Sequence, residues 1–152
     1  PIIMIDHDTA LEESTEKIIE LLEEKKYFMI RDEMLKYNEA DIAEMFEELF
    51  DLEDKLESTM VVYRLLPKAV SVEVFSFLPQ DDQMAIVQGI TTSELSYIVQ
   101  ELDFDDKIDI LEELPANIVN TILENTPKDE RYLINSFLNF NIKICRKIIS
   151  RC

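Results

Sequence analysis

The chain contains very little glycine, proline, tryptophan or histidine. Its 152 residues include one glycine (Gly89), five prolines, no tryptophan and one histidine, His7. This composition argues against a sheet-rich fold with many tight turns, and a single glycine cannot form a glycine-rich phosphate loop. No apolar run approaches the roughly eighteen residues that a transmembrane helix needs, so we expect a soluble chain.

Cysteine and positive charge are also scarce. Cys145 and Cys152 have no further metal-ligating side chains nearby, which indicates reduced thiols of a cytosolic protein. Lys and Arg number 15 against 33 Asp and Glu, a formal net charge of −18. Such a charge repels nucleic acid and phosphate-rich membranes, and it attracts metal cations or basic protein surfaces. His7 lies near the N-terminus, where an exposed residue is expected, so the folded core lacks a catalytic base and we expect no enzyme.

The sequence does contain an internal repeat of twelve residues. Six units run without a break from residue 67 to 138, and two more at 38–49 and 55–66 precede them around a five-residue insertion. The eighth position of the six units is always Val or Ile: Val74, Ile86, Ile98, Ile110, Ile122 and Ile134. Apolar residues at positions 8, 9 and 12 have the spacing of one helical stripe. Each unit is therefore predicted to form a short amphipathic helix of about nine residues.

The first residue of each unit suits a helix start. These residues are Asn38, Pro67, Pro79, Thr91, Asp103, Pro115 and Pro127. Thr91 with Glu94, and Asp103 with Asp106, have the three-residue offset of a capping pair. Helices this short are marginal in water alone, so they must pack on one another. We therefore expect helical hairpins stacked into an α-solenoid.

The repeat divides the chain into three regions. Residues 1–37 are predicted to form N-terminal capping helices, at about 8–25 and 27–37, and residues 38–138 the helical repeat domain. Residues 139–152 are interpreted as a basic C-terminal helix or as a cut end of the sequence. This last region contains no acidic residue and four cations, Lys143, Arg146, Lys147 and Arg151.

Carboxylates form rows on several of the predicted helices. Asp105, Asp106 and Asp109 are three or four residues apart, and a similar row includes Glu44 and Glu47. Like charges at this spacing cost stability unless a cation lies close. A hard cation such as Mg²⁺ typically takes one or two carboxylates and keeps several waters. From the residues alone, the rows indicate either a solvated acidic face or a cation site.

Three strings resemble the cytosolic N-terminal domain of MgtE-type magnesium transporters. They are EADIAEMFEEL at 39–49, VYRLLP at 62–67 and LDFDDKIDILEELP at 102–115. The resemblance implies a superhelix of short helices, so the expected fold is all-α, a right-handed superhelical solenoid in twelve-residue units. It also implies a following pair of CBS domains and a dimeric transmembrane pore, which would place the domain at the cytoplasmic face of the cell membrane.

The resemblance further implies that Mg²⁺ between this domain and the CBS pair draws the two together and closes the pore. On the matching motifs, Asp105, Asp106 and Asp109 are the best metal-ligand candidates, with Glu44 and Glu47 as weaker ones. The alternative is a stand-alone helical-repeat scaffold that binds a protein segment, similar to the flagellar motor switch protein.

Overall fold

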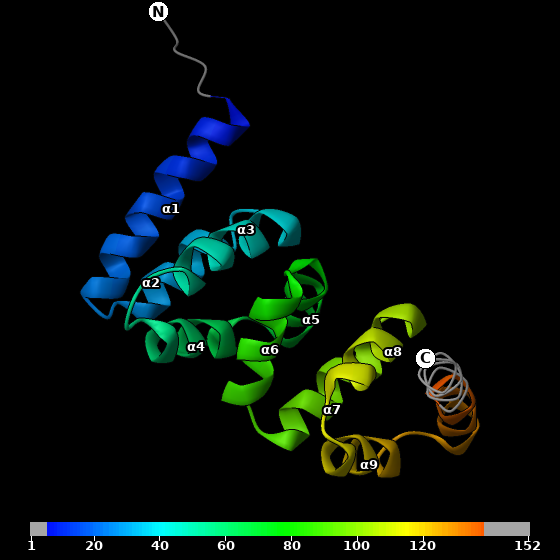
Figure 1. Cartoon of the computed structure of the whole chain (residues 1–152). Coiled ribbons are helices and arrows are strands. Elements are labelled where there is room, and N and C mark those ends of the chain that lie inside the picture. The colour runs from blue at the N-terminus through cyan, green and yellow to red at the C-terminus, as the bar shows by residue number, and fades with distance from the viewer. Residues whose placement is uncertain (1–5, 139–152) are drawn as a thin grey trace, which may run out of the picture. The chain divides into compact units, whose positions relative to one another are not determined.

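The chain is all-helical over the residues that the structure, a computed structural model, describes, namely 6–138 (Figure 1). The predicted basic region 139–152 lies outside them. No strand occurs in 6–138, so the all-α prediction is confirmed. The helices are α1 (His7–Glu23), α2 (Tyr27–Met34), α3 (Glu39–Phe50), α4 (Leu56–Leu65), α5 (Lys68–Phe77), α6 (Gln80–Gly89), α7 (Thr92–Glu101), α8 (Phe104–Glu113) and α9 (Ala116–Glu124). A further helical stretch covers 128–138.

The twelve-residue register is confirmed by where the helices begin. From α4 to α9, each helix starts twelve residues after the one before it, and the stretch 128–138 continues the series. Between α3 and α4 the spacing is longer, because the inserted residues 50–54 extend α3 to Phe50 and add a turn. Helices α4 to α8 have ten residues each and α9 has nine, close to the predicted length.

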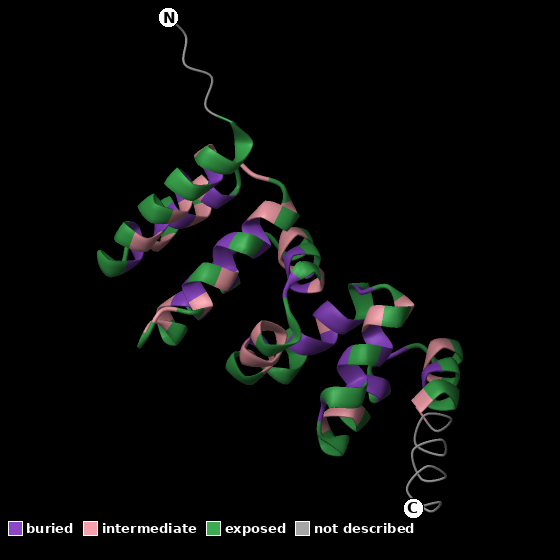
Figure 2. Cartoon of the chain, turned by 45° about the horizontal axis from the view of Figure 1, so that its top comes forward, coloured by how far each residue is buried: buried purple, intermediate pink, exposed green. Residues whose placement is uncertain are grey.

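The repeated eighth position supplies the core. Its residues are all buried: Met45, Val62, Val74, Ile86, Ile98, Ile110, Ile122 and Ile134. Figure 2 shows this burial as purple stripes along helices whose other faces are exposed. Each fully buried aliphatic side chain of this size contributes about 1.5–3 kcal/mol to folding. Helices too short to be stable alone are therefore held by the stripe that they share.

Two of the helix starts are capped by side chains as the sequence predicts. Asn38 Oδ1 accepts from the Asp41 amide at 2.9 Å. Thr91 Oγ1 accepts from the Glu94 amide at 3.2 Å and donates to the Glu94 carboxylate at 3.1 Å. The prediction for Asp103 is wrong, because its side chain makes no capping hydrogen bond. A hydroxyl can accept from the amide and donate to the carboxylate three residues on, whereas two carboxylates in these places repel each other.

The first helix ends two residues before the predicted position, in a Schellman motif. Lys25 has a φ of 57°, the left-handed conformation that stops the helix. The amide of Lys25 donates to the carbonyl of Leu22 at 3.1 Å, and that of Lys26 donates to Leu21 at 3.0 Å. The second helix also ends early, at Met34, three residues before the predicted end at 37. The turn that follows leads directly into the cap of α3.

The chain divides into two compact units, Pro1–Gly89 and Ile90–Cys152. In the first unit α1 packs on α3 and α3 on α5, while α2 packs on α4 and α4 on α6. In the second unit α7 packs on both α8 and α9. Within each unit, contact between helices two places apart in the chain is the pattern expected of stacked helical hairpins.

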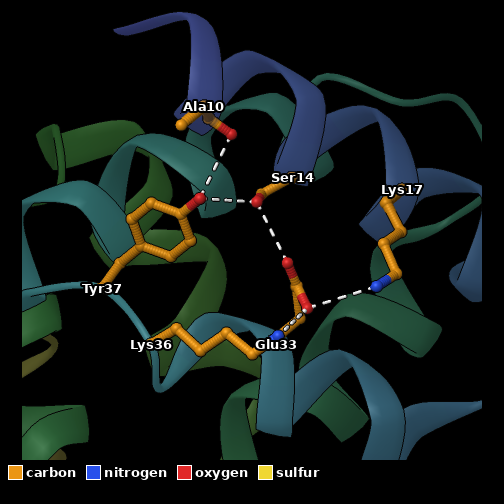
Figure 3. A network of polar contacts seen from close by, with 6 residues as sticks. All are labelled: Ala10, Ser14, Lys17, Glu33, Lys36 and Tyr37. Carbon is orange, nitrogen blue, oxygen red and sulfur yellow. Dashed lines mark hydrogen bonds and ion pairs between the residues drawn. The ribbon is translucent and has the colours of Figure 1, made fainter. Parts of the chain in front are cut away.

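A polar network joins α1 to the end of α2 (Figure 3). Ser14 Oγ, on α1, donates to Glu33 Oε1 at 3.0 Å and lies 2.6 Å from the hydroxyl of Tyr37. That hydroxyl donates to the carbonyl of Ala10 at 3.1 Å. Lys36 lies 2.9 Å from Glu33, and its hydrogen bond is the main cause that lowers the pKa of the Glu33 carboxyl. The network joins the N-terminal helix to α2 and to the turn that follows α2.

Candidate functional site

The acidic string of the second unit lies at the start of α8. Asp105 and Asp109 are exposed and Asp106 is half-buried. Asp103, at the N-cap, adds a fourth carboxylate to the first turn and a half. The structure therefore brings the three predicted ligands together on one helix of one compact unit.

The electrostatics of α8 centre on Asp106. Partial burial raises the pKa of its carboxyl, and the neighbouring charges of Asp103, Asp109 and Asp105 raise it further, in that order. A raised carboxyl pKa means that the folded chain disfavours the charged form at this place. The charges of these three aspartates add to the negative potential at Asp106, which a bound cation would relieve.

Lys107 has a different role from the aspartates around it. It is 7% exposed, and its ammonium donates a hydrogen bond to Glu130 in the helical stretch 128–138. Phe104, at the start of α8, packs edge-to-face on Phe137 of the same stretch, with ring centroids 5.1 Å apart. These contacts hold α8 in place and direct the cation of Lys107 to Glu130. Sequence reasoning missed this lysine, although a charged residue at a position that is apolar in several other units was a visible signal.

The two weaker candidates, Glu44 and Glu47, lie on α3 in the first unit. Glu44 is exposed, and it lies near His7, whose pKa it helps to raise. Glu47 is half-buried near Asp82 of α6. Burial raises the pKa of Asp82 to about 6, with further contributions from Glu47, Asp51 and Asp81. This second acidic cluster joins two helices, and Asp51 and Asp82 were not anticipated from sequence.

Within each unit the carboxylates do not converge into a complete metal site. Across residues 6–138, no group of three or more His, Cys, Asp or Glu side chains has the arrangement needed to hold a metal ion. The donor chemistry still fits Mg²⁺, because the oxygens are carboxylates and the charges of Asp103, Asp109 and Asp105 add to burial in raising the pKa of Asp106. The α8 carboxylates are thus suited to supply part of a coordination shell.

The single histidine, His7, makes an ion pair at the start of α1. His7 Nε2 lies 2.8 Å from Asp41 Oδ2, which joins the start of α1 to α3. Its side chain is 60% exposed, in line with the expected exposure. The cysteines, Cys145 and Cys152, lie outside the described residues.

Comparison with known proteins gives one family. The model of the MgtE intracellular N domain matches residues 37–142, which begin just before α3. No curated protein matches the chain. Over residues 6–138, no helix is both long enough and apolar enough to cross a membrane. Because the matched range covers more than half of the sequence, the chain belongs to the MgtE intracellular N domain family.

Proposed function

We propose that this chain is the Mg²⁺-sensing regulatory domain of a magnesium transporter. The family is the intracellular N domain of such transporters, and it is not an enzyme family. In the proposed mechanism the domain docks onto adjacent CBS domains through bridging Mg²⁺ and so gates the pore of the same transporter, which works as a dimer at the cytoplasmic face of the membrane. Within each unit, the twelve-residue register and the packing of every second helix support stacked helical hairpins, and the family resemblance is the basis for a right-handed superhelical solenoid.

The observation that carries this proposal is the uncompensated carboxylate cluster of Asp105, Asp106 and Asp109. Bound Mg²⁺ would supply positive charge and an ordered shell of oxygen ligands. In its absence, the α8 surface repels an acidic partner domain. When Mg²⁺ is bound, the docked state is stabilised, because the docked state binds Mg²⁺ more tightly than the free state does. Ligands contributed by the partner account for a cluster that is incomplete within its own unit.

The first unit offers a second, weaker set of ligands. Glu47 lies near Asp82, whose carboxyl has a pKa of about 6, and a nearby cation would lower that pKa. Glu44 is exposed on the same helix. We place these residues below the α8 aspartates, because Glu47 and Asp82 are partly buried and less accessible to a partner domain.

The test compares two triple variants of equal charge change. Asp105→Asn with Asp106→Asn and Asp109→Asn removes the cluster, whereas Glu13→Gln with Glu20→Gln and Glu57→Gln removes three exposed carboxylates elsewhere. Amide NMR shifts are followed during a MgCl₂ titration at constant ionic strength. We expect saturable shifts over 103–109 in the wild-type chain and in the control, and a loss of about tenfold or more in affinity in the cluster variant, equivalent to about 1.4 kcal/mol.

The intact transporter gives the second readout. There, Mg²⁺-dependent docking of the domain should require the three aspartates. Docking is measured as protection of the domain from proteolysis. The proposal is wrong if the cluster variant docks at the same Mg²⁺ concentration as the wild type.

A further inference from the structure

A hollow of about 350 Å³ lies between α1 and α3, within the first unit. Leu11, Thr15 and Ile19, one turn apart on α1, form one row of its lining, and this row is largely apolar. The other lining residues are all glutamates: Glu12 and Glu16 of α1, and Glu44 and Glu48 of α3. One turn of a helix with its side chains occupies roughly 400–600 Å³, so the hollow is too small for a helix. We call it the α1–α3 groove.

The groove is negatively charged on both sides. On each helix the two glutamates are four residues apart, so they lie on one face. All four are exposed, and within residues 6–138 none of them takes part in an ion pair. The only lysine of the two helices, Lys17, pairs with Glu33 of α2. The charges of the groove therefore repel one another, and a cationic ligand would reverse that effect.

The groove offers hydrogen-bond acceptors without donors. Ionised glutamates only accept, and the hydroxyl of Thr15 already donates to the carbonyl of Leu11 at 2.7 Å. The lining residues lie inside α1 and α3, where backbone amides are used by the helix itself. A peptide in the groove would bring carbonyl groups for which these residues have no donor. A ligand whose polar groups are all donors fits better.

The apolar row sets a second requirement. A hydrated metal ion donates through its waters but gains nothing from Leu11 and Ile19, whereas methylene groups placed on them leave water. Residues four apart on a helix are about 6 Å apart along its axis. Two ammonium groups joined by three or four methylenes are separated by roughly 5–6 Å. The spacing of charge along the groove therefore matches that of a linear aliphatic polyamine.

Other contacts hold α1 beside its neighbours. His7, at the start of α1, is paired with Asp41 of α3 at 2.8 Å. Ser14 of α1 is bonded to Glu33 and Tyr37 (Figure 3). A ligand would thus meet a groove whose two helices are already together, which lowers the entropic cost of binding.

We propose that the α1–α3 groove binds a linear aliphatic polyamine. The methylene chain lies over Leu11 and Ile19, and the ammonium groups pair with glutamates of both helices. The bound ligand joins α1 to α3 and removes the repulsion between their glutamates, so it stabilises the first unit. The site uses none of the aspartates of α8 and shares only Glu44 with the residues considered for Mg²⁺. It does not depend on the proposed Mg²⁺ sensing.

The test is a titration of the full chain with spermidine, followed by amide NMR shifts in Mg²⁺-free buffer at about 150 mM salt. Hexaamminecobalt(III) is the matched ligand, because it has the same positive charge and N–H donors but no methylene chain. We expect saturable shifts over 11–19 and 44–48 with spermidine, and about tenfold weaker binding of hexaamminecobalt(III). Equal affinities would mean that charge alone attracts the ligand. Tighter binding of a tetralysine peptide would indicate a protein partner. Either result would overturn the proposal.

Two double variants of α1 locate the site. Glu12→Gln with Glu16→Gln removes two glutamates of the groove, and should weaken spermidine binding about tenfold. Glu13→Gln with Glu20→Gln makes the same charge change at exposed positions that do not line the groove, and should bind as the wild type does. The amide spectra themselves report whether each variant is folded.

Ile19→Thr tests the apolar row. It should weaken spermidine binding several-fold and leave hexaamminecobalt(III) binding unchanged, because only the methylene chain uses this side chain. A wild-type chain without saturable shifts, or a control that loses as much affinity as the groove variant, would contradict the proposal. Because the buffer contains no Mg²⁺, failure here leaves the sensing proposal to its own titration.

Discussion

Lys107, buried in the acidic string of α8, donates a hydrogen bond to Glu130 two helices later in the chain. The two side chains are unequally exposed, 8% for Lys107 and 32% for Glu130. Removal of the carboxylate leaves a buried ammonium without its partner, whereas removal of the ammonium leaves a carboxylate that water can reach. The pair should therefore respond asymmetrically to substitution.

Glu130→Ala is expected to lower the free energy of unfolding by about 2–3 kcal/mol, since it strands a buried charge. Lys107→Met keeps most of the side-chain volume and should cost about 1 kcal/mol or less. Urea denaturation measures both. Asp129→Ala, at an exposed neighbouring position, serves as the control and should change stability by no more than about 0.5 kcal/mol. A larger loss in Lys107→Met than in Glu130→Ala would contradict this account.

The hydroxyl of Tyr37 should stabilise the attachment of α1. It lies 2.6 Å from Ser14 Oγ and donates to the Ala10 carbonyl, so Tyr37→Phe should cost about 1–2 kcal/mol. Tyr27→Phe is the matched control, because the Tyr27 hydroxyl makes only a 3.5 Å contact with Ser58. Hydrogen exchange should show faster opening of α1 in Tyr37→Phe alone. Equal effects of the two substitutions would mean that the network does not hold the helix.

The repeat could be read from sequence because its cause is local. A residue at the eighth position of a unit is buried whichever helix it meets, so the periodicity alone predicted burial at Val74, Ile110 and Ile134. The start of α7 was predictable for the same reason, since Thr91 and Glu94 are three residues apart.

What escaped prediction depends on packing between helices. Lys107 and Glu130 are 23 residues apart, and only the positions of α8 and the stretch 128–138 bring them together. The pKa of Asp82 is raised first by burial and then by the charges of Glu47, on α3, and Asp51, just after the end of α3. The three aspartates of α8 could be proposed from sequence because their spacing is local, but the partner that would complete a cation site is not encoded in that spacing.

Asp82 should make stability depend on pH in an unusual direction. Its carboxyl has a pKa of about 6 in the folded chain against 3.8 for the unperturbed group. Between these values the folded chain holds a proton that the unfolded chain has released. The contribution of Asp82 to the free energy of unfolding therefore falls as the pH rises from about 4 to 6. Asp82→Asn should therefore stabilise the chain at pH 7, by about 1 kcal/mol after allowance for solvent screening.

Thermal melting across pH 4 to 7 tests this dependence. The wild-type chain and Asp82→Asn should converge in stability near the acidic end and diverge toward pH 7. Glu73→Gln removes an exposed carboxylate of α5 and is the control. Its stability should differ from that of the wild type by the same amount at every pH in this range. Parallel curves of stability against pH for the wild type and Asp82→Asn would show that folding does not raise the pKa of the Asp82 carboxyl.

The single histidine provides a direct measurement of the α1–α3 contact. Its ion pair with Asp41, 2.8 Å from Nε2 to Oδ2, is the main cause that raises the pKa of His7 above 6.5, followed by the charges of Asp8 and Glu44. The stabilisation from this pair is present below pH 6.5 and is lost as the pH rises through the pKa of the folded state. An NMR titration of the one imidazole should show that Asp41→Asn returns the pKa toward 6.5, with a smaller decrease in Asp8→Asn. If Asp8→Asn had the larger effect, α1 would not be joined to α3 through His7.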